Sequence, residues 1–422
     1  MSAFKHPSRL ALEPVPENIT NERLSCTDDH LPDSVFKILD PDSGRMYGFA
    51  VVDDTRRGPG LGGIRLARDL TLEEVKRLAR VMTLKNSGAN LPYGGGKSGL
   101  IGDPSFLNQN PRLKSDLISM FAEAIFELDS YIPAPDMGTD ERDLQIIHEV
   151  YSRHGAGSQD FRGVTGRPIE NGGIPVDDWG LTAHGLLAAS ETLEKIDDQF
   201  KIKNSSVVVQ GYGNVGSCTA IKLQQAGATI VGASDIHAGL WNPQGLNTDE
   251  LNRVRHSSQG LQNYTGKIQK KFVGKKLDWL MEAPCEFLVP AARPDSITSR
   301  NADRIQCKVI LQGANTPSNK MTEYYLKNRR GILSLNDFIV NVGGVVGCAV
   351  EIKMAADPEY RDKVRETGTR TYLEDLIYST VSRNVEEIFQ RLKGSPQDTL
   401  FREQALELVE ERLNSHQKEC WL

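Results

Sequence analysis

The sequence predicts an α/β protein of two domains, the second built on a doubly wound sheet. Three observations lead to this prediction. The chain has 422 residues, which is long enough for two hydrophobic cores. After residue 205 a strand-like segment runs directly into a glycine-rich turn and a helix. Three further strand-like segments follow, and each ends in small or polar residues, as strands of a doubly wound sheet do where ligands bind.

Composition argues against several functional classes. Apolar residues make up 39% and charged residues 25% of the chain, as in an ordinary globular protein. The net charge is −6, and no basic stretch indicates a nucleic-acid partner. No apolar run reaches membrane-spanning length, and the first residues lack the core of a signal peptide. The six cysteines and eight histidines form no ligand cluster. We therefore expect a cytoplasmic protein without a metal site, a membrane partner or a nucleic-acid partner.

The first domain is expected to span residues 1–185. Residues 1–30 are polar and poor in pattern, which predicts an irregular arm. A strand-like pattern at 34–53 precedes a glycine-dense loop at 58–65. Helical periodicity follows this loop and returns at 113–128.

Lys85 continues the core-facing stripe of the first of these helices. Thr71 begins the helix with a capping box that pairs it with Glu74. A lysine at the end of an apolar stripe either reaches out to water or holds an anion. On this pattern alone, the first alternative is favoured, because desolvating an ammonium group is costly.

Lys97 follows the three glycines at 94–96. Such a run allows positive φ angles and a close approach of the backbone to a ligand. A lysine that loses solvent there has a lowered pKa and can serve as a general base. The spacing of a phosphate-binding loop is not met, since Leu91 stands where its first glycine would be. A glycine-rich turn with an incidental lysine fits the pattern equally well.

Asp136 lies between two prolines and a glycine, which fix its backbone. Taken alone, it is expected to cap the helix predicted at 141–150.

A glycine-rich turn after the strand at 207–210 indicates a dinucleotide site. The turn has the spacing G-x-G-x-x-G, opens a helix that runs to Gln225, and precedes a strand at 228–233. Asp235 follows this strand, where it would hydrogen-bond the adenosine ribose and repel a 2′-phosphate, which favours NAD over NADP. The helix N-terminus would receive the pyrophosphate. The turn residues expected to bind the cofactor are Gly211, Gly213, Asn214, Val215 and Gly216.

Strand-like segments at 286–289, 308–311 and 332–335 complete the second domain, which is expected to span residues 186–354. The remaining residues, 355–422, carry amphipathic helical patterns, which we assign to core or subunit packing without chemistry.

Taken in order, these motifs resemble those of the glutamate/leucine/phenylalanine/valine dehydrogenase family, from about Phe36 to the C-terminus. The resemblance implies an enzyme that interconverts an L-amino acid and its 2-oxo acid plus ammonia by hydride transfer. It also implies two domains that close over a cleft, with C-terminal helices that pack on the substrate domain, and a homo-oligomer, for which we favour a hexamer. The matching motifs lie at 58–65, 82–99, 133–139, 211–216, 313–317 and 341–345.

The resemblance also assigns roles to individual residues. Lys97 matches the lysine that activates the attacking water, and Asp136 matches the aspartate that relays protons to and from the amino group. Lys85 matches the lysine that pairs with the substrate α-carboxylate. The other residues expected at the substrate are Leu61, Gly62, Asn341, Val345 and Cys348. Those expected to join the glycine-rich turn and Asp235 at the cofactor are Thr182, Ala291 and Asn315.

Two departures from the family pattern bear on the substrate. Glutamate-specific members carry a lysine where this chain has Leu61, and a serine where it has Cys348. A distal carboxylate would lose both polar contacts, which costs several kcal/mol for a charged group. We therefore expect an apolar substrate, branched or aromatic. The alternatives are a glutamate dehydrogenase with an atypical pocket and a non-catalytic dinucleotide-binding relative.

Three further departures have no clear meaning in the sequence. Asp177 and Asp178 stand near the place of a family arginine, either as a solvated acid pair or as contacts to an unusual substrate. Gln312 replaces a common glutamate, and Asn336 replaces a common proline.

Overall fold

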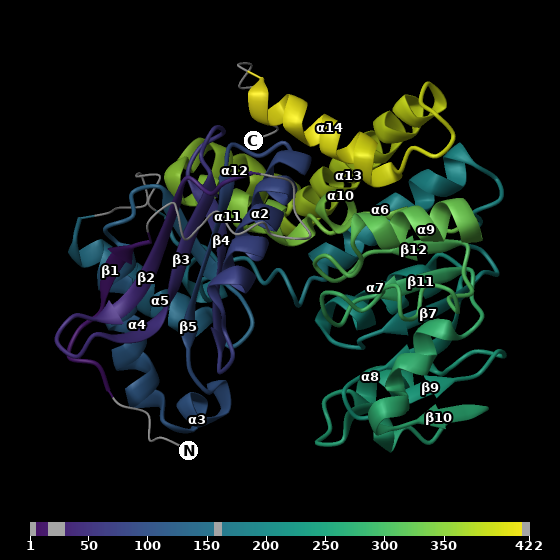
Figure 1. The fold of residues 1–422 in the computed structure, drawn as a ribbon, viewed down its shortest axis with the longest axis horizontal. Helices are drawn as coiled ribbons and strands as arrows, with labels where there is room; N and C mark the ends of the chain where they lie inside the picture. The colour runs from purple at the N-terminus through teal and green to yellow at the C-terminus, as the bar shows by residue number, and fades with distance from the viewer. Residues whose placement is uncertain (1–5, 16–29, 156–162, 416–422) are drawn as a thin grey trace. The chain divides into compact units, whose positions relative to one another are not determined.

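The structure is a computed structural model that describes residues 6–15, 30–155 and 163–415 (Figure 1). Its chain forms two compact units, each with its own sheet. This confirms the predicted α/β fold of two domains. The first unit contains residues 1–175, 345–369 and 410–422, and the second contains residues 176–344 and 370–409.

The first unit is built on a mixed sheet with the strand order β1-β2-β3-β5-β4-β6. The strands from β1 to β5 pair antiparallel, whereas β4 runs parallel to both β5 and β6. The central strands β5 and β4 therefore end at the same edge as β6, which places the residues that follow them close together. The strands are β1 (Ala11–Pro14), β2 (Ser34–Asp40), β3 (Arg45–Asp54), β4 (Gly60–Ala67), β5 (Gly94–Ile101) and β6 (Tyr131–Pro135).

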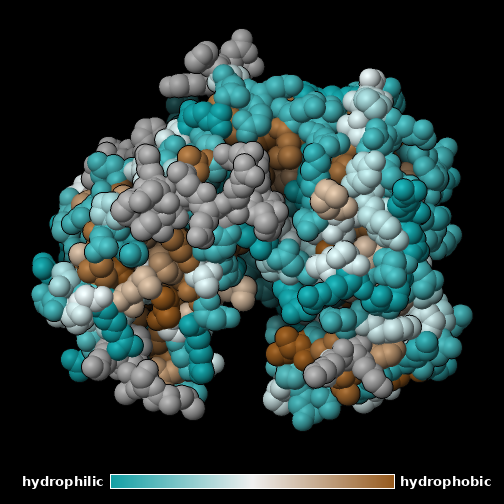
Figure 2. All heavy atoms as spheres, in the orientation of Figure 1, coloured by the Kyte–Doolittle hydropathy of each residue, from teal (hydrophilic) through white to brown (hydrophobic). Residues whose placement is uncertain are grey.

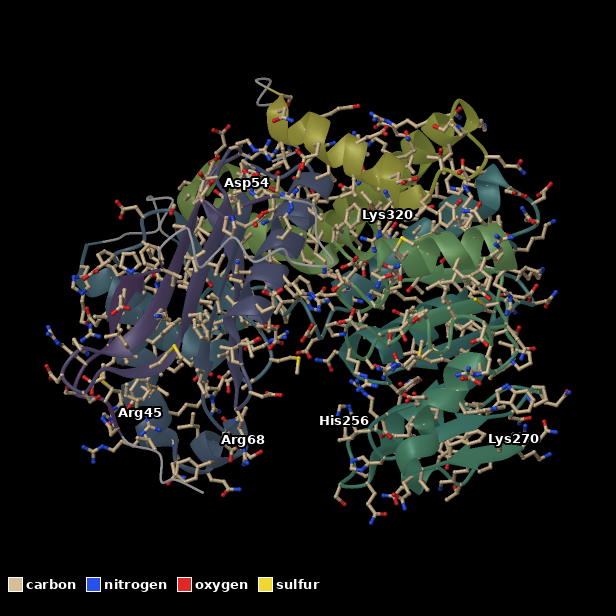
Figure 3. All side chains as sticks on the ribbon, in the orientation of Figure 1. Arg45, Asp54, Arg68, His256, Lys270 and Lys320 are labelled. Atoms are coloured by element: carbon tan, nitrogen blue, oxygen red, sulfur yellow. The ribbon has the colours of Figure 1, made fainter. Side chains whose placement is uncertain are left out.

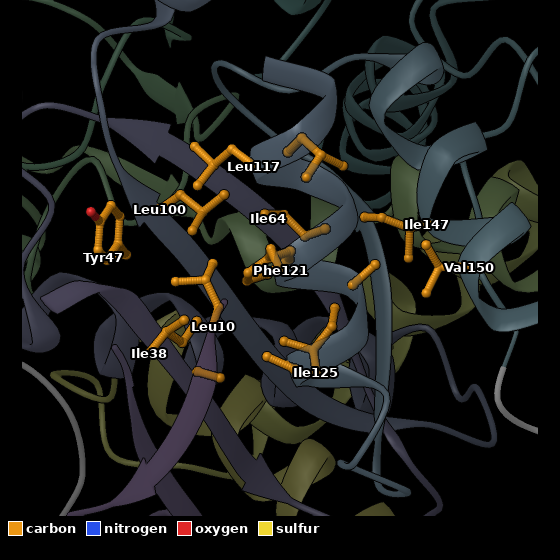
Figure 4. Close-up of a cluster of buried hydrophobic side chains, with 14 of the residues drawn as sticks. Leu10, Ile38, Tyr47, Ile64, Leu100, Leu117, Phe121, Ile125, Ile147 and Val150 are labelled. Atoms are coloured by element: carbon orange, nitrogen blue, oxygen red, sulfur yellow. The ribbon is translucent and has the colours of Figure 1, made fainter. Parts of the chain in front are cut away.

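Helices cover both faces of this sheet. Helix α2 (Leu72–Gly88) packs on β3, β4 and β5, with Val75 and Ala79 against Phe49 and Val51. Alternate residues of β3 point to the other face, as strand geometry requires. That face carries the main core, in which α4 (Pro111–Ile125) and α5 (Glu141–Arg153) contribute apolar side chains (Figure 4). The remaining helices of the unit are α3 (Pro104–Gln109), α11 (Gly343–Ala356), which starts in the second unit, and α12 (Pro358–Thr367).

The glycine-dense segments are strands, which corrects the loop and the turn expected for them. Glycines 94–96 have no positive φ angle, so conformational freedom is not their purpose. A Cβ on Gly95 would lie 2.2 Å from the backbone nitrogen of Thr83 in α2, and one on Gly96 would lie 2.6 Å from the ring of Tyr131. The glycines let a helix backbone and an aromatic ring pack directly on the strand.

The expected irregular arm at 1–30 is also corrected in part. Residues 11–14 form β1, which pairs with β2 at the edge of the sheet. Residues 1–5 and 16–29 lie outside the described part of the chain.

The second unit contains a sheet with the order β10-β9-β8-β7-β11-β12-β13. Strands β8, β7, β11, β12 and β13 are parallel, which confirms the doubly wound arrangement predicted from the sequence. Strands β9 and β10 run antiparallel at one edge, which the sequence did not indicate. The strands are β7 (Ser206–Gln210), β8 (Thr229–Ser234), β9 (Gly239–Trp241), β10 (Lys270–Phe272), β11 (Phe287–Pro290), β12 (Val309–Leu311) and β13 (Leu333–Leu335).

The helices of this unit cover a sheet that is apolar on both faces, as parallel sheets are. Most of the molecular face in Figure 2 is hydrophilic, so the polar sides of the helices meet the solvent. The helices are α6 (Leu181–Ile196), α7 (Asn214–Gln225), α8 (Thr248–Val254), α9 (Lys320–Arg330), α10 (Asp337–Val340), α13 (Thr369–Lys393) and α14 (Phe401–Asn414), of which α14 ends in the first unit.

The units divide the chain differently from the expected domains 1–185, 186–354 and 355–422. The expected boundary at 185 would cut the continuous helix α6. We also expected every helix after residue 355 to pack on the first domain, but residues 370–409 belong to the second unit. Helix α13 packs there on α6, where Thr192 Oγ1 hydrogen-bonds Ser382 Oγ at 2.8 Å.

One helical stretch, Asp337–Ala356, is long and apolar enough to cross a membrane, but 78% of its most apolar window is buried inside the protein. Such burial is typical of a core helix.

Candidate active site

Lys97 and Asp136 form an ion pair, with Lys97 Nζ 2.8 Å from Asp136 Oδ2. Lys97 lies on β5 and is 4% exposed, and Asp136 follows β6. Strand β4 separates these two strands, and the side chains meet over its Gly63. A Cβ on Gly63 would lie 2.7 Å from the Cβ of Asp136 and 3.1 Å from Lys97 Nζ. The missing side chain at Gly63 therefore makes room for the pair.

Arg65 is a third member of this site that the sequence analysis did not single out. Its Nε donates to Asp136 Oδ2 at 3.0 Å, and its Nη1 donates to Glu74 Oε1. The sequence predicted Glu74 only as part of a capping box with Thr71. One of the two bonds of that box is present, in which Thr71 Oγ1 accepts from the backbone nitrogen of Glu74 at 3.2 Å. Arg65 stands two residues after Gly63, so strand alternation places it on the same face. That spacing is the signal that could have identified it.

Burial and charge set the protonation of this cluster. Burial lowers the pKa of Lys97, Arg65 lowers it further by repulsion, and the attraction of Asp136 opposes both. Burial alone would raise the pKa of Asp136, but Lys97 and Arg65 outweigh it and lower the pKa to about 2. Asp136 is therefore ionised at neutral pH, and Lys97 releases its proton more readily than an ordinary lysine does.

Replacing Arg65 by glutamine is expected to move the rising limb of the pH–rate profile to higher pH. The positive charge of Arg65 lowers the pKa of Lys97, so its removal raises that pKa, and Lys97, in the role of base that the resemblance implies, then needs a higher pH to be neutral. The measurement is kcat/KM for oxidative deamination as a function of pH. Glu74→Gln is the control of opposite sign, since Glu74 raises the pKa of Lys97. A limb that moves the same way in both variants contradicts this account.

The cap alternative for Asp136 is wrong. Asp140 is the N-cap of α5, in a reciprocal capping box with Asp143. The carboxylate of Asp136 does not cap this helix and instead pairs with Lys97 and Arg65.

Lys85 and Leu61 lie on neighbouring buried elements. Lys85 is 5% exposed in the last turn of α2, so it does not reach out to water as the sequence pattern alone favoured. The next residue, Asn86, donates to the carbonyl oxygens of Gly94 at 2.6 Å and Leu61 at 3.3 Å. These bonds fix the end of α2 on β4 and β5. The carbonyl oxygen of Gly62 accepts from Tyr131 Oη at 2.8 Å, which gives Gly62 a structural contact.

Helix α11 carries Val345 and Cys348 in the first unit, one turn apart. The carbonyl oxygen of Cys348 accepts from Thr165 Oγ1 at 3.4 Å. Thr165 is buried, and the sequence did not indicate it. One turn further along α11, the buried carboxylate of Glu351 accepts from the backbone nitrogens of residues 166 and 174. It also accepts from Arg167 Nε at 3.3 Å. Glu351 thus anchors the 165–174 segment beside Cys348.

The three glycines of the glycine-rich turn in the second unit differ in what surrounds them. Gly211 has a φ of +91°, and a Cβ on it would lie 2.6 Å from Cα of Ala292. A Cβ on Gly216 would lie 1.9 Å from the carbonyl oxygen of Gly211. Gly213 has a φ of −82° and nothing within 4 Å of its Cβ position. The fold requires the first and third glycines, whereas the second leaves open space at the N-terminus of α7. A pyrophosphate fits that space.

Asp235 contributes to the structure of the adjoining loop. Its Oδ1 accepts from the backbone nitrogens of His237 and Ala238 at 2.8 Å each, and its Oδ2 accepts from the nitrogen of Leu261 at 2.7 Å. A carboxylate offers about four acceptor positions, so a ribose hydroxyl could still donate to it.

Of the other residues expected at the cofactor, Ala291 and Asn315 follow the carboxyl ends of strands, and Thr182 is in a helix. The nitrogen of Ala291, after β11, donates to the carbonyl oxygen of Gln210 at 2.7 Å. Thr182 is in the first turn of α6, and Asn315 is in the turn after β12.

Asn341, Asp177 and Asp178 belong to the second unit. Asn341 was expected to line the substrate site, but it belongs to the second unit, where its Nδ2 donates to the carbonyl oxygen of Gly313 at 2.6 Å. Asp177 Oδ2 accepts from Asn214 Nδ2 at 3.0 Å, beside the glycine-rich turn. Its exposed neighbour Asp178 is in the same unit. Among the described residues, no three His, Cys, Asp or Glu side chains are grouped so as to hold a metal ion.

Comparison with known proteins identifies the family to which the chain is similar. The model of the Glutamate/Leucine/Phenylalanine/Valine dehydrogenase family matches residues 172–406. The model of the Glu/Leu/Phe/Val dehydrogenase dimerisation domain matches residues 32–153. The NADP-specific glutamate dehydrogenase of Saccharolobus shibatae is 36% identical, over 72% of this chain and 70% of that protein. The catabolic NAD-specific glutamate dehydrogenase of Bacillus subtilis is 35% identical, over 68% and 66%. The hetero-hexameric glutamate dehydrogenase of Thermus thermophilus in its Leu-bound form matches with a TM-score of 0.73 and 27% identity, over 96% and 88%.

Proposed function

Because the chain belongs to the glutamate/leucine/phenylalanine/valine dehydrogenase family, and is thus an amino acid dehydrogenase, we propose that it oxidises an L-amino acid with an apolar side chain, using NAD. The products are the 2-oxo acid and ammonia, and the same site catalyses the reverse reductive amination. The observation that supports this proposal most strongly is the buried pair of Lys97 and Asp136. Burial and the neighbouring Arg65 lower the pKa of Lys97, and groups with such shifts gather at functional sites.

The residues of the first unit take the following roles in this proposal. The cofactor, when bound, accepts the hydride from Cα of the substrate. Lys97 takes a proton from the water that attacks the resulting iminium, which its lowered pKa favours. Asp136 exchanges protons with the amino group, and Arg65 helps to keep it ionised. Lys85 binds the α-carboxylate and thereby holds Cα in place.

The residues of the second unit bind NAD. The open space at Gly213 receives the pyrophosphate, and Asp235 accepts from the adenosine ribose. Thr182 and Asn315 contact the nicotinamide end. The relatives include an NAD-specific and an NADP-specific enzyme, so the preference for NAD rests on Asp235.

Three positions support an apolar substrate: two carry uncharged side chains, and the third carries a cation that is paired with a carboxylate. Leu61 is buried where glutamate-specific members carry a lysine, and Cys348 replaces a serine. Arg167 follows Thr165, which contacts Cys348, by two residues, and its guanidinium is paired with Glu351, one turn along α11 from Cys348. A distal carboxylate would therefore have to compete with Glu351 for this cation, at a considerable cost in desolvation.

A glutamate substrate is the second candidate, and the names of the relatives favour it. The deciding measurement is NADH production at alkaline pH with leucine, valine, phenylalanine, tryptophan and glutamate. We expect turnover with at least one apolar amino acid and none with glutamate. Turnover with glutamate alone would refute the apolar pocket and leave the catalytic pair intact, whereas no turnover with any amino acid would count against the proposed activity.

We also propose that the enzyme is a cytoplasmic homo-oligomer, with a hexamer favoured. The match of residues 32–153 to a dimerisation domain supports self-association. Light scattering of the purified protein would measure the assembly size, and a monomer would refute this assignment.

A further inference from the structure

A buried ion pair joins helices α14 and α9 within the second unit. Arg402 Nε donates to Glu323 Oε2 at 2.7 Å, and Arg402 Nη2 donates to Glu323 Oε1 at 2.8 Å. Arg402 Nη2 also reaches the carbonyl oxygen of Ser318 at 3.1 Å. Both charged side chains are buried, and the two parallel bonds fix their orientation.

Glu323 continues this pair into a network of buried amides. Its Oε1 accepts from Gln312 Nε2 at 2.7 Å and from Asn336 Nδ2 at 2.9 Å. Gln312 and Asn336 are two of the departures from the family pattern, and both are fully buried. The network accounts for both of them, because each amide donates to the same carboxylate. Neither departure therefore needs an unusual substrate to explain it.

The network holds the turn at 313–316 from both sides. Gln312 directly precedes this turn, and its Oε1 accepts from the nitrogen of Asp337 at 3.1 Å. Asp337 Oδ2 in turn accepts from the nitrogen of Thr316 at 3.0 Å. Thr316 has a φ of +41°, a conformation that a β-branched residue adopts only when its surroundings enforce it. Asn315, expected at the cofactor, stands between these two anchored ends.

A buried ion pair is weak evidence of stabilisation, because desolvation offsets the attraction of its charges. Its fixed geometry is better explained by a role in positioning. We propose that Arg402 and Glu323 are positioning residues that hold the turn at 313–316, and with it Asn315, in the geometry that binds the nicotinamide cofactor. The C-terminal helix α14 then sets the affinity of a site that it does not itself form. This inference rests on the proposed use of NAD.

The double variant Arg402→Met/Glu323→Gln tests this role. It removes both charges of the pair together, so neither partner stays buried without the other, and it keeps an amide able to accept from Asn336. We expect NADH to bind about tenfold more weakly, because the turn loses its pre-organisation. The KM for NAD should rise while kcat and the KM for the amino acid change little. A variant with only a lower melting temperature would show a merely structural role and overturn the proposal.

The matched control removes a second ion pair between the same helices. Lys320 (labelled in Figure 3) lies 2.7 Å from Glu403 and is more than half exposed. Lys320→Met/Glu403→Gln leaves the turn untouched and should keep wild-type NADH affinity. An equal loss in both double variants would refute a specific role for Arg402.

A charge-relocation variant keeps the test decisive if the first variant folds poorly. Glu323→Gln leaves Arg402 without its carboxylate, and adding Gln312→Glu returns a carboxylate to the network, since atoms of these two side chains lie 2.7 Å apart. NADH affinity should fall in the single variant and recover in the double variant. Failure to recover would count against the proposal. If the wild-type protein does not bind NADH at all, the assigned cofactor fails first, and this inference fails with it.

Discussion

Replacing Lys97 by alanine is expected to lower kcat by about 10²–10⁴-fold, the range that one general acid–base group contributes. The variant should still bind NADH, because the residues assigned to the cofactor belong to the other unit of the chain. Steady-state turnover and NADH fluorescence titration on the same preparation would measure both quantities. Unchanged turnover would refute the mechanism.

Lys114 offers a matched control for this experiment. It is also buried in the first unit, and its Nζ lies 2.6 Å from Asp143 Oδ2. Lys114→Ala therefore breaks a comparable ion pair between α4 and the N-terminal capping box of α5, where Lys114 Nζ also lies 3.6 Å from Asp140 Oδ2. We expect a loss of stability of a few kcal/mol but a normal kcat in the folded protein. A loss of turnover equal to that of Lys97→Ala would mean that the first result reports damage to the unit as a whole.

The second large effect is expected from Gly213→Ala. The methyl group would enter the open space at the N-terminus of α7, and NADH should bind at least about tenfold more weakly because the pyrophosphate needs the same space. The backbone is extended, with a φ of −82°, so alanine meets no steric strain there, and the melting temperature should fall only slightly because alanine is a poorer N-cap than glycine. Isothermal titration with NADH and a thermal melt would test both expectations. Undiminished affinity would show that the pyrophosphate does not approach Gly213.

Two other glycines of the second unit provide controls for this experiment. Gly394→Ala adds a methyl group in a loop, 3.7 Å from the carbonyl oxygen of Arg391, and it should change neither affinity nor stability. Gly216→Ala would bring a Cβ to within 1.9 Å of the carbonyl oxygen of Gly211, so it should destabilise the fold itself. Loss of binding with little loss of stability is therefore expected only at Gly213.

Five strands of the second unit and its helix α7 could be predicted from the sequence. In this part of the chain, strands and helices follow one another. Each strand pairs with the next strand of a regular sheet, and helix α7 packs on elements that are near it in the sequence. A βαβ unit is a local pattern, so the periods of two and 3.6 residues suffice to identify it. The antiparallel strands β9 and β10 are short, and nothing in their three residues indicates a direction.

The first unit was harder because its glycines serve tertiary packing. Glycine in a sequence indicates a turn, yet Gly95 and Gly96 lie within a strand, where a helix backbone and the ring of Tyr131 take the place of their side chains. The partners of those glycines come from α2 and β6, and no local rule assigns them. For the same reason Arg65 was overlooked: its carboxylate partner Asp136 is supplied by a distant strand.

By itself, the sequence determined the fold class, the dinucleotide turn, and, through its resemblance to a family, which lysines and aspartate to consider. These are properties of spacing along the chain, and spacing is set before the chain folds. Only the tertiary structure decided which of these groups meet. The order β5-β4-β6 brings Lys97, Arg65 and Asp136 to one point over Gly63, and the turn at 313–316 is held by a helix from the end of the chain. Burial at such meeting points shifts the pKa values, because a charge that has lost water depends on its neighbours.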